Sequence, residues 1–403
     1  MNYYRLDQVC EINPKKEISS ALNGEISFIP MDAVSTDGKI DTSRTISTKD
    51  IKNYTVFRDG DVLFAKITPC MENGKGAITA GLKNGCGAGS TEFIVLRPDT
   101  EKISQKWLYL FLSQKSFRLY CQQNMMGSAG QKRVPSKFLA ACVLPVPALK
   151  KQEQIITRIE ELFSQLGSGV ETLEKVKQQL AVYRQAVLKE AFDTALHDCQ
   201  MLSIEQFLTK DRKGMSTGPF GTMIKKQDHK TYGVPMLGIE NIGRGQFVDG
   251  NKIFVTPKKA EELWAFVLKE GDIIISRSGT VGEICAVPQR TEGALLSTNL
   301  MRISLDNSII RSDYFISLFQ SKGVVLDQIK ELCKGSTRDF LNQTILKQIV
   351  FPVPSLETQE RIVNDIDAKM SVCDSIEQTV DTALQQAEAM RQSILKQAFE
   401  GGL

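Results

Sequence analysis

The chain contains a long internal repeat. Residues 144–192 align without a gap on residues 351–399 at a constant offset of 207, and 19 of the 49 aligned positions are identical. Self-similarity of this length is the first constraint on how a chain can fold. It predicts two equivalent halves, each a globular segment followed by a long helix. We call residues 1–149 head 1 and residues 199–350 head 2.

Each copy of the repeat has a helical pattern. It opens with a Pro-Val-Pro run, at residues 145–147 and 352–354, which favours an extended segment that ends one domain. Apolar residues then recur at spacings of three and four, as in a coiled coil. The first series is Ile155, Ile159, Leu162, Leu166, Leu173, Val176, Leu180, Tyr183 and Val187. The second series is Ile362, Ile366, Cys373, Ile376, Val380, Ala383, Ala387, Met390 and Ile394.

The pattern predicts helical regions at residues 150–198 and 351–403. A single helix cannot bury its own apolar series, so we expect the two helices to pack on each other. Because the halves are equivalent, the pair should be antiparallel; the alternative is that each helix packs on its own head. Gly167 and Gly169 cost the first helix ~2 kcal/mol of propensity. They predict a kink there, whereas the second helix has Asp374 and Ile376.

The two heads are related more loosely and predict an α+β fold. In each head a turn leads into a buried strand that ends on a basic residue, at residues 60–66 and 271–277. A glycine-rich loop follows each strand, and a second polar-to-apolar strand comes next. A short helix is then expected around residues 107–120 and 313–329. The expected head is a curved sheet with one or two helices, and the loops differ between the heads.

Charge separates the heads from the helices. Residues 1–149 carry a net charge of +5 and residues 199–350 a net charge of +4. Residues 150–198 carry −1 and residues 351–403 carry −5. Basic heads are the minimum expected of a surface that contacts phosphates.

The sequence also predicts where the protein works. Nine scattered cysteines without a Cys-x-x-Cys pair argue against zinc and against a disulfide framework. There is no apolar stretch of the ~18 residues that a membrane helix needs. The opening residues lack the apolar core of a signal peptide. These features predict a cytoplasmic protein.

The sequence offers little catalytic chemistry. The two histidines, His197 and His229, stand alone, and no phosphate-binding G-x-x-x-x-G-K-[ST] loop occurs. Asp32 with Asp37-Gly38-Lys39 loosely matches a nuclease carboxylate–lysine site, but Asp-Gly-Lys is also an ordinary turn. The pattern favours a binding protein without catalytic residues of its own.

In the order of its motifs the chain resembles the specificity subunits of type I restriction–modification enzymes. The resemblance covers essentially the whole chain. It rests on residues 63–76 of head 1, on Gly218-Pro219-Phe220-Gly221 of head 2, and on three paired features of the repeat. These features are the Pro-Val-Pro runs, the junction pairs Gln152-Glu153 and Gln359-Glu360, and the helix ends at residues 184–192 and 391–399.

The resemblance implies a fold and a set of partners. It implies two target recognition domains, residues 1–149 and 199–350, separated by two long helices in an antiparallel coiled coil. Each domain would read one half of a split, asymmetric site in double-stranded DNA, and the helices would set the unread spacer. Two methyltransferase subunits would dock on the chain, and restriction–translocase subunits would join them. S-adenosylmethionine would then bind the methyltransferase, and ATP with Mg²⁺ the translocase, with no cofactor or metal in this chain.

The resemblance also gives roles to loop residues of both heads. Residues expected to contact phosphates or guanine edges are Lys66, Lys75, Lys132, Arg133, Lys225, Lys226, Arg277, Lys334 and Arg338. Residues expected to read base edges are Asn73, Gln131, Asn241, Ser278, Thr280 and Asn299. The expected DNA-binding set is completed by Thr68, Thr91, Phe220 and Ser336. The alternative for many of these residues is that they cap turns or face solvent.

Two other classes of function remain. A free-standing DNA-binding regulator with two heads would bind a split site without partners. An enzyme in its own right would need a catalytic constellation that the motifs do not supply.

Overall fold

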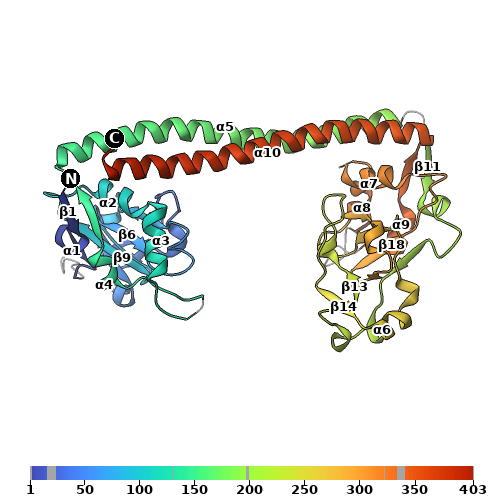
Figure 1. Ribbon diagram of the computed structural model, residues 1–403, viewed down its shortest axis with the longest axis horizontal. Coiled ribbons are helices and arrows are strands. Elements are labelled where there is room, and N and C mark those ends of the chain that lie inside the picture. The colour runs from blue at the N-terminus through green and yellow to red at the C-terminus, as the bar shows by residue number, and fades with distance from the viewer. Residues whose placement is uncertain are drawn as a thin grey trace. The chain divides into compact units, whose positions relative to one another are not determined.

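The computed structural model describes residues 2–15, 24–128, 130–196, 199–321, 323–333 and 341–402. The chain divides into two compact units. Unit 1 comprises Met1–Leu173 and Asp381–Leu403, and unit 2 comprises Glu174–Val380. Each unit holds one head and a part of both long helices (Figure 1). We describe each unit by itself.

Head 1 in unit 1 contains two four-stranded sheets. The first sheet is antiparallel, in the order β2 (Cys10–Ile12), β9 (Phe93–Pro98), β6 (Val62–Ala65) and β7 (Gly76–Ile78). The second has the order β4 (Thr45–Ser47), β3 (Glu25–Ile29), β8 (Cys86–Gly89) and β5 (Thr55–Arg58), with β3 parallel to β8. The helices of this head are α1 (Leu6–Val9), α2 (Gln105–Leu112), α3 (Lys115–Gln123) and α4 (Ser136–Ala141).

Head 2 in unit 2 follows the same plan with a smaller second sheet. Its antiparallel sheet has the order β12 (Met215–Thr217), β18 (Leu300–Ile303), β15 (Ile273–Ser276) and β16 (Ile284–Ala286). The three-stranded sheet has the order β14 (Ile253–Val255), β13 (Val234–Leu237) and β17 (Leu295–Leu296). The helices are α6 (Pro257–Glu262), α7 (Ser312–Gln320), α8 (Leu326–Cys333) and α9 (Gln343–Gln348).

The α+β fold class is therefore confirmed, with one correction. The sequence predicted a single short helix after the second strand of each head. Each head has two helices there, α2 with α3 after β9 and α7 with α8 after β18. In head 1 the break falls at Ser113, whose backbone N–H bonds back to the carbonyl of Tyr109 (3.0 Å) before the chain turns at Gln114. Both helices bury one face in the head core, which includes Trp107 and Phe111 from α2 and Phe117 from α3.

A two-stranded ribbon connects each head to its long helix. In unit 1, β1 (Asn2–Arg5) pairs with β10 (Val143–Val146), and in unit 2, β11 (Gln200–Ser203) pairs with β19 (Val350–Val353). Both proline runs are thus extended, as predicted. The chain then enters α5 (Leu149–Leu196) or α10 (Leu356–Glu400).

The two long helices pack against each other within both units. In unit 1 the start of α5 lies beside the end of α10, where Ile155 and Ile159 share a core with Leu395 and Phe399. In unit 2 the end of α5, with Phe192, shares a core with the start of α10. Beginning meets end in both cases, so the helices are antiparallel, as predicted.

The details of the helix pair differ from the predicted pattern. Tyr183, Ile376 and Met390 were assigned to the apolar seam, yet their side chains are exposed. A strict seven-residue pattern drifts on a helix of 3.6 residues per turn, which explains such misplacements. At Gly167 and Gly169, where the sequence predicted a kink, the helix is not broken, because α5 runs as one continuous helix through both.

The helices of the described residues include none that could span a membrane. The cysteines that can be assessed in these residues are free: Cys10, Cys70, Cys86, Cys121, Cys142, Cys199, Cys285 and Cys373.

Candidate DNA interface

Three segments of head 1 meet where β6 ends. The backbone N–H of Lys66 donates to the carbonyl of Glu92 (2.9 Å), and the N–H of Val134 donates to the carbonyl of Lys66 (2.9 Å). Next along the chain, the N–H of Thr68 donates to the carbonyl of Lys132 (3.0 Å). These bonds gather predicted DNA-binding residues from three loops: Lys66, Thr68, Thr91, Lys132 and Arg133.

One of these residues has an acidic partner. The Arg133 guanidinium donates to both carboxylate oxygens of Glu92 over 2.8–3.1 Å. These hydrogen bonds hold the pKa of Glu92 below its usual range. The Arg133 side chain is 42% exposed, so it can reach a ligand while it stays paired. The pair fixes the direction of the guanidinium and offsets part of its charge.

A pocket of 520 Å³ lies beside this meeting point. Lys66 and Thr91 line it, together with Lys15, Lys52 and Tyr54. The last three were not predicted from the sequence, because they lie outside the glycine-rich loops. Lysines around an aromatic ring suit a groove that holds a nucleic-acid backbone. A search for basic residues near Tyr or Asn on neighbouring segments would have found the run 52–54.

The loop after β6 is supported from beneath by a buried arginine. Arg118 of α3 donates to the carbonyls of Met71 (3.1 Å), Gly74 (3.4 Å) and Lys75 (3.3 Å), and it lies over the ring of Phe64. Burial lowers the pKa of Arg118 to about 10. The loop therefore keeps one shape and leaves its tip exposed.

Three predicted residues of head 1 lie on or beside these supported loops. Asn73 is exposed at the tip of the loop after β6. The Lys75 ammonium donates to the carbonyl of Met31 (2.8 Å), so it links the loop before β7 to the segment after β3. Gln131 is exposed on the loop before Arg133.

Head 2 repeats the meeting of three segments. The N–H of Arg277 donates to the carbonyl of Asn299 (3.0 Å), and the N–H of Leu341 donates to the carbonyl of Arg277 (2.9 Å). The Arg277 side chain also donates to the carbonyls of Thr298 (3.2 Å) and Leu341 (3.3 Å). Partial burial lowers the pKa of Arg277. The Arg277 side chain therefore holds the loop that carries Thr298 to the segment that begins at Leu341.

The Phe220 loop joins this group. Thr298 Oγ1 donates to the carbonyl of Pro219 (2.7 Å). A Cβ on Gly218 would overlap the carbonyl of Ser297, so only glycine allows the two loops to approach so closely. Phe220 is 63% exposed. It therefore stands next to the loop that carries Asn299, also exposed.

The other predicted residues of head 2 are placed differently from one another. Ser278 and Thr280 lie on the loop after β15, and Thr280 is exposed. Lys225 and Lys226 are exposed around the short helical segments Gly221–Met223 and Lys226–Asp228. Lys334, Ser336 and Arg338 lie outside the described residues.

Asn241 is fully buried in head 2. Its Oδ1 accepts from the N–H of Gly238 (2.9 Å), and its Nδ2 donates to the carbonyls of Val248 (3.0 Å) and Gly250 (2.9 Å). The side-chain amide is thus used inside the loop. In this conformation it faces backbone groups, where the sequence had suggested a base edge.

The carboxylates that resembled a nuclease site belong to a turn. Asp37 pairs with Lys39 (2.7 Å), and the N–H of Ser35 donates to the carbonyl of Lys39 (3.0 Å). Asp32 pairs with Arg44 (2.9 Å), and this contact lowers the pKa of Asp32. Within the described residues, no group of three His, Cys, Asp or Glu side chains could hold a metal ion.

Known proteins resemble this chain over most of its length. The family model described as the type I restriction modification DNA specificity domain matches residues 1–179 and 219–386. The specificity subunit of the type I restriction enzyme EcoEI of Escherichia coli is 25% identical over 476 residues, which cover 94% of this chain and 79% of that relative. The EcoAI specificity subunit of Escherichia coli is 47% identical over 163 residues, or 40% of this chain, and the match spans only 27% of that relative.

Two solved structures share the fold. A chain from a structure on complex assembly and conformational transition of the type I R-M system matches all of this chain and 98% of its own length, with a TM-score of 0.80 at 19% identity. The HsdS subunit from Thermoanaerobacter tengcongensis matches over the same full length of this chain and 97% of its own, with a TM-score of 0.56 at 18% identity. At such low identity these likenesses concern the fold alone.

Proposed function

The chain belongs to the type I restriction modification DNA specificity family, and from that premise we propose that it is the subunit that gives a type I restriction–modification complex its DNA sequence specificity. Each head would read one half of a split, asymmetric site in double-stranded DNA. Residues 1–149 and 199–350 would be the two target recognition domains, and residues 150–198 and 351–403 the helical regions that set the spacer.

One observation carries this proposal. Both heads bring the residue after a buried strand, Lys66 or Arg277, against two other loops through the same pair of backbone hydrogen bonds. The surrounding side chains differ, with Asn73 and Lys132 in head 1 and Phe220 and Asn299 in head 2. A shared frame with different polar loops suits two readers of different sequences, because base edges are distinguished by side-chain hydrogen bonds.

The partners follow from the same proposal. The chain would work in the cytoplasm and would have no catalytic residues of its own. Two methyltransferase subunits, which bind S-adenosylmethionine, would dock on it. Restriction–translocase subunits that use ATP and Mg²⁺ would complete the complex. The helical part of unit 2 exposes apolar side chains that suit such docking: Val182, Tyr183, Val372 and Ile376.

The decisive experiment is methylome sequencing. A host without its own DNA methyltransferases would receive this gene together with the neighbouring methyltransferase gene. We expect a new split motif of methylated adenines, which would give both half-sites and the spacer. Replacing residues 199–350 by the corresponding segment of a relative should change one half-site and leave the other intact.

A different result would favour the stand-alone regulator. If a soluble complex forms without any methylation, and the chain alone binds a split DNA site tightly, then the subunit function is wrong. A specificity subunit should depend on its methyltransferase for tight binding, whereas a regulator should not.

A further inference from the structure

Two fully buried glutamines connect the heads to the long helices. Gln152 is the fourth residue of α5 and Gln359 the fourth residue of α10, and neither side chain is exposed to solvent. They lie at the offset of 207 that relates the two halves. A buried side-chain amide without partners is costly, so the use of each polar atom matters.

In unit 1 the amide of Gln152 makes three hydrogen bonds. Its Oε1 accepts from the backbone N–H of Ser104 (2.9 Å). Its Nε2 donates to the carbonyls of Lys102 (2.9 Å) and Pro147 (2.8 Å). Ser104 is the N-cap residue of α2, and Pro147 precedes α5. One side chain thus joins a head helix to the start of the long helix.

In unit 2 the amide of Gln359 makes the same three bonds. Its Oε1 accepts from the N–H of Arg311 (2.8 Å), the N-cap residue of α7. Its Nε2 donates to the carbonyls of Ile309 (2.9 Å) and Pro354 (2.9 Å). Every partner again lies 207 residues beyond its counterpart. Only glutamine offers an acceptor and two donors at this reach.

A second contact strengthens each junction. In unit 1, Trp107 Nε1 donates to the carbonyl of Pro145 (2.8 Å), and its ring packs on Phe399 from the end of α10. In unit 2, the Tyr314 hydroxyl donates to the carbonyl of Pro352 (3.0 Å), and Phe192 from the end of α5 packs on its ring. The residue type has changed while the contact has been kept.

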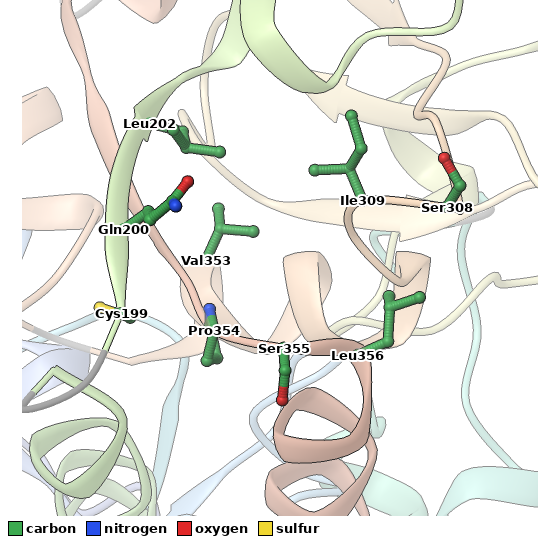
Figure 2. Close-up of a pocket in the computed structure, with 9 residues that line it drawn as sticks. All are labelled: Cys199, Gln200, Leu202, Ser308, Ile309, Val353, Pro354, Ser355 and Leu356. Atoms are coloured by element: carbon green, nitrogen blue, oxygen red, sulfur yellow. The ribbon is translucent and has the colours of Figure 1, made fainter.

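The second junction borders a surface pocket of 630 Å³ (Figure 2). Ile309 and Pro354, whose carbonyls accept from Gln359, line this pocket with Ser355 and with Leu356, the first residue of α10. Two of the carbonyls that bind the Gln359 amide thus lie at the edge of a surface pocket.

The junctions lead directly to the candidate DNA interface. Helix α2, capped by Ser104, packs on β6 and β7, and Lys66 directly follows β6. Helix α7, which follows Arg311, packs on β16, the partner of β15, and Arg277 directly follows β15. An uninterrupted series of contacts thus runs from each long helix, through one glutamine, to the loops of one head.

We propose that Gln152 and Gln359 are positioning residues that fix the direction of each head on its helix, and so set how strictly the complex selects the length of the DNA spacer. This inference rests on the function proposed above. Helix length would set the mean spacer, and the stiffness of the two junctions would set the tolerance around it.

The test uses the complete methyltransferase complex and a library of DNA sites. The library keeps both half-sites and varies the spacer by one or two base pairs around the wild-type length. The variants are Gln152→Met and Gln359→Met, which keep the side-chain length and lose all three hydrogen bonds. Sequencing gives the ratio of methylation at altered spacers to methylation at the wild-type spacer.

The controls remove buried volume away from the junctions. Ile26→Ala acts in a separate small cluster of head 1, and Val255→Ala acts in one of head 2. Such changes lower the amount of folded protein. They should lower methylation equally at all spacers, so the ratio separates a loss of stability from a loss of positioning.

We expect each glutamine variant to raise the ratio on the order of ten-fold, because buried groups left without partners release the junction. The half-site sequences should not change. Hydrogen exchange of the Ser104 and Arg311 amides should accelerate in the matching variant. If a methionine variant fails to assemble, Gln152→Asn and Gln359→Asn keep the amide but withdraw it by one carbon, and should show the same relaxation.

An unchanged ratio in assembled glutamine variants, with a normal motif in the wild type, would overturn this inference alone. Altered half-sites with an unchanged ratio would also overturn it, because the glutamines would then shape the reading loops. If the wild-type complex gives no split motif at all, the proposed function fails and this inference fails with it.

Discussion

In head 1 the buried carboxylate of Asp61 pairs with Arg97 of the neighbouring strand β9, whereas in head 2 the matching Asp272 pairs with Arg212, which precedes the sheet. Both carboxylates also accept from a backbone N–H three residues earlier, that of Arg58 or Lys269. The turn before the buried strand is thus the same in both heads, but the arginine that pairs with the carboxylate comes from a different segment in each.

The junctions show the opposite behaviour. There every hydrogen bond of Gln152 has its counterpart at Gln359, at one constant offset. The comparison teaches that the two halves have kept the attachment of head to helix more strictly than the interior of the heads. This is what selection for different loops on a common frame would produce.

The largest expected effect tests the shared buried carboxylate. Asp61→Asn and Asp272→Asn should each cost ~3–5 kcal/mol in their own head, because each removes the buried carboxylate of an ion pair with a mostly buried arginine. Hydrogen exchange of β6 and β15 in the intact chain measures this. Asp249→Asn, in the exposed pair with Arg290, should cost far less, because solvent screens that pair.

This prediction can fail in an informative way. If Asp272→Asn is much milder than Asp61→Asn, then Ser304 Oγ, which donates to the same carboxylate (2.8 Å), can satisfy the amide as well. The two heads would then differ in stability and not only in the source of the arginine.

A smaller effect is expected for the loop after β6 in head 1, which Arg118 supports. Arg118→Met should destabilise head 1 by ~1–3 kcal/mol, because several backbone carbonyls lose a buried donor. The amides of Asn73 and Gly74 should exchange faster, and base selection in the first half-site should relax while the second stays strict. Arg158→Met, in an exposed pair with Glu161, is the matched control and should change neither.

The next comparison concerns DNA directly. Lys66→Ala should affect only the first half-site and Arg277→Ala only the second, each by ~1–3 kcal/mol if the side chain reads a base. Binding of the assembled complex to single-base variants measures this. Lys189→Ala, on the exposed surface of α5, removes the same charge as a control.

A uniform loss over all sequences would assign a phosphate contact instead. The salt dependence of binding should then fall by about one unit of slope. Relaxation of both half-sites by one substitution would contradict the division of labour between the heads.

Much of this architecture was predictable from the sequence, because a repeat constrains local and long-range structure together. The repeat that aligns Phe192 with Phe399 predicted both long helices. Because the two halves are equivalent, it also predicted that the helices are antiparallel. The second strand predicted in each head is also present, because β9 begins at Phe93 and β18 begins at Leu300.

What the sequence could not give is the fate of individual polar atoms. Asn241 was polar and close to glycines, yet its amide is used by three backbone groups inside the fold. Arg277 is bound to carbonyls that lie 21 and 64 residues away. Such long-range partners leave no local pattern, so residue types alone could not separate supporting groups from exposed ones.

The smallest expected effect concerns the two long helices. Gly167 and Gly169 lie in α5 where the second copy of the repeat has Asp374 and Ile376. An added Cβ would meet nothing within 4 Å at either glycine.

In unit 2 the carboxylate of Asp374 pairs with Arg184 (2.6 Å). Burial disfavours the charge of Arg184, but Asp374 and Glu377 outweigh it and raise the pKa of Arg184.

Gly169→Ala should therefore stabilise the chain by ~0.5–1 kcal/mol, since alanine loses less backbone entropy in a helix and fits the open space. Thermal unfolding of the purified complex would show a higher midpoint. Gly279→Ala is the matched control: its Cβ would also meet open space, but its φ of +81° disfavours any side chain, so it should destabilise. If Gly169→Ala lowers the midpoint, then that stretch of α5 needs glycine for a conformation or a close contact that a continuous, open helix does not require.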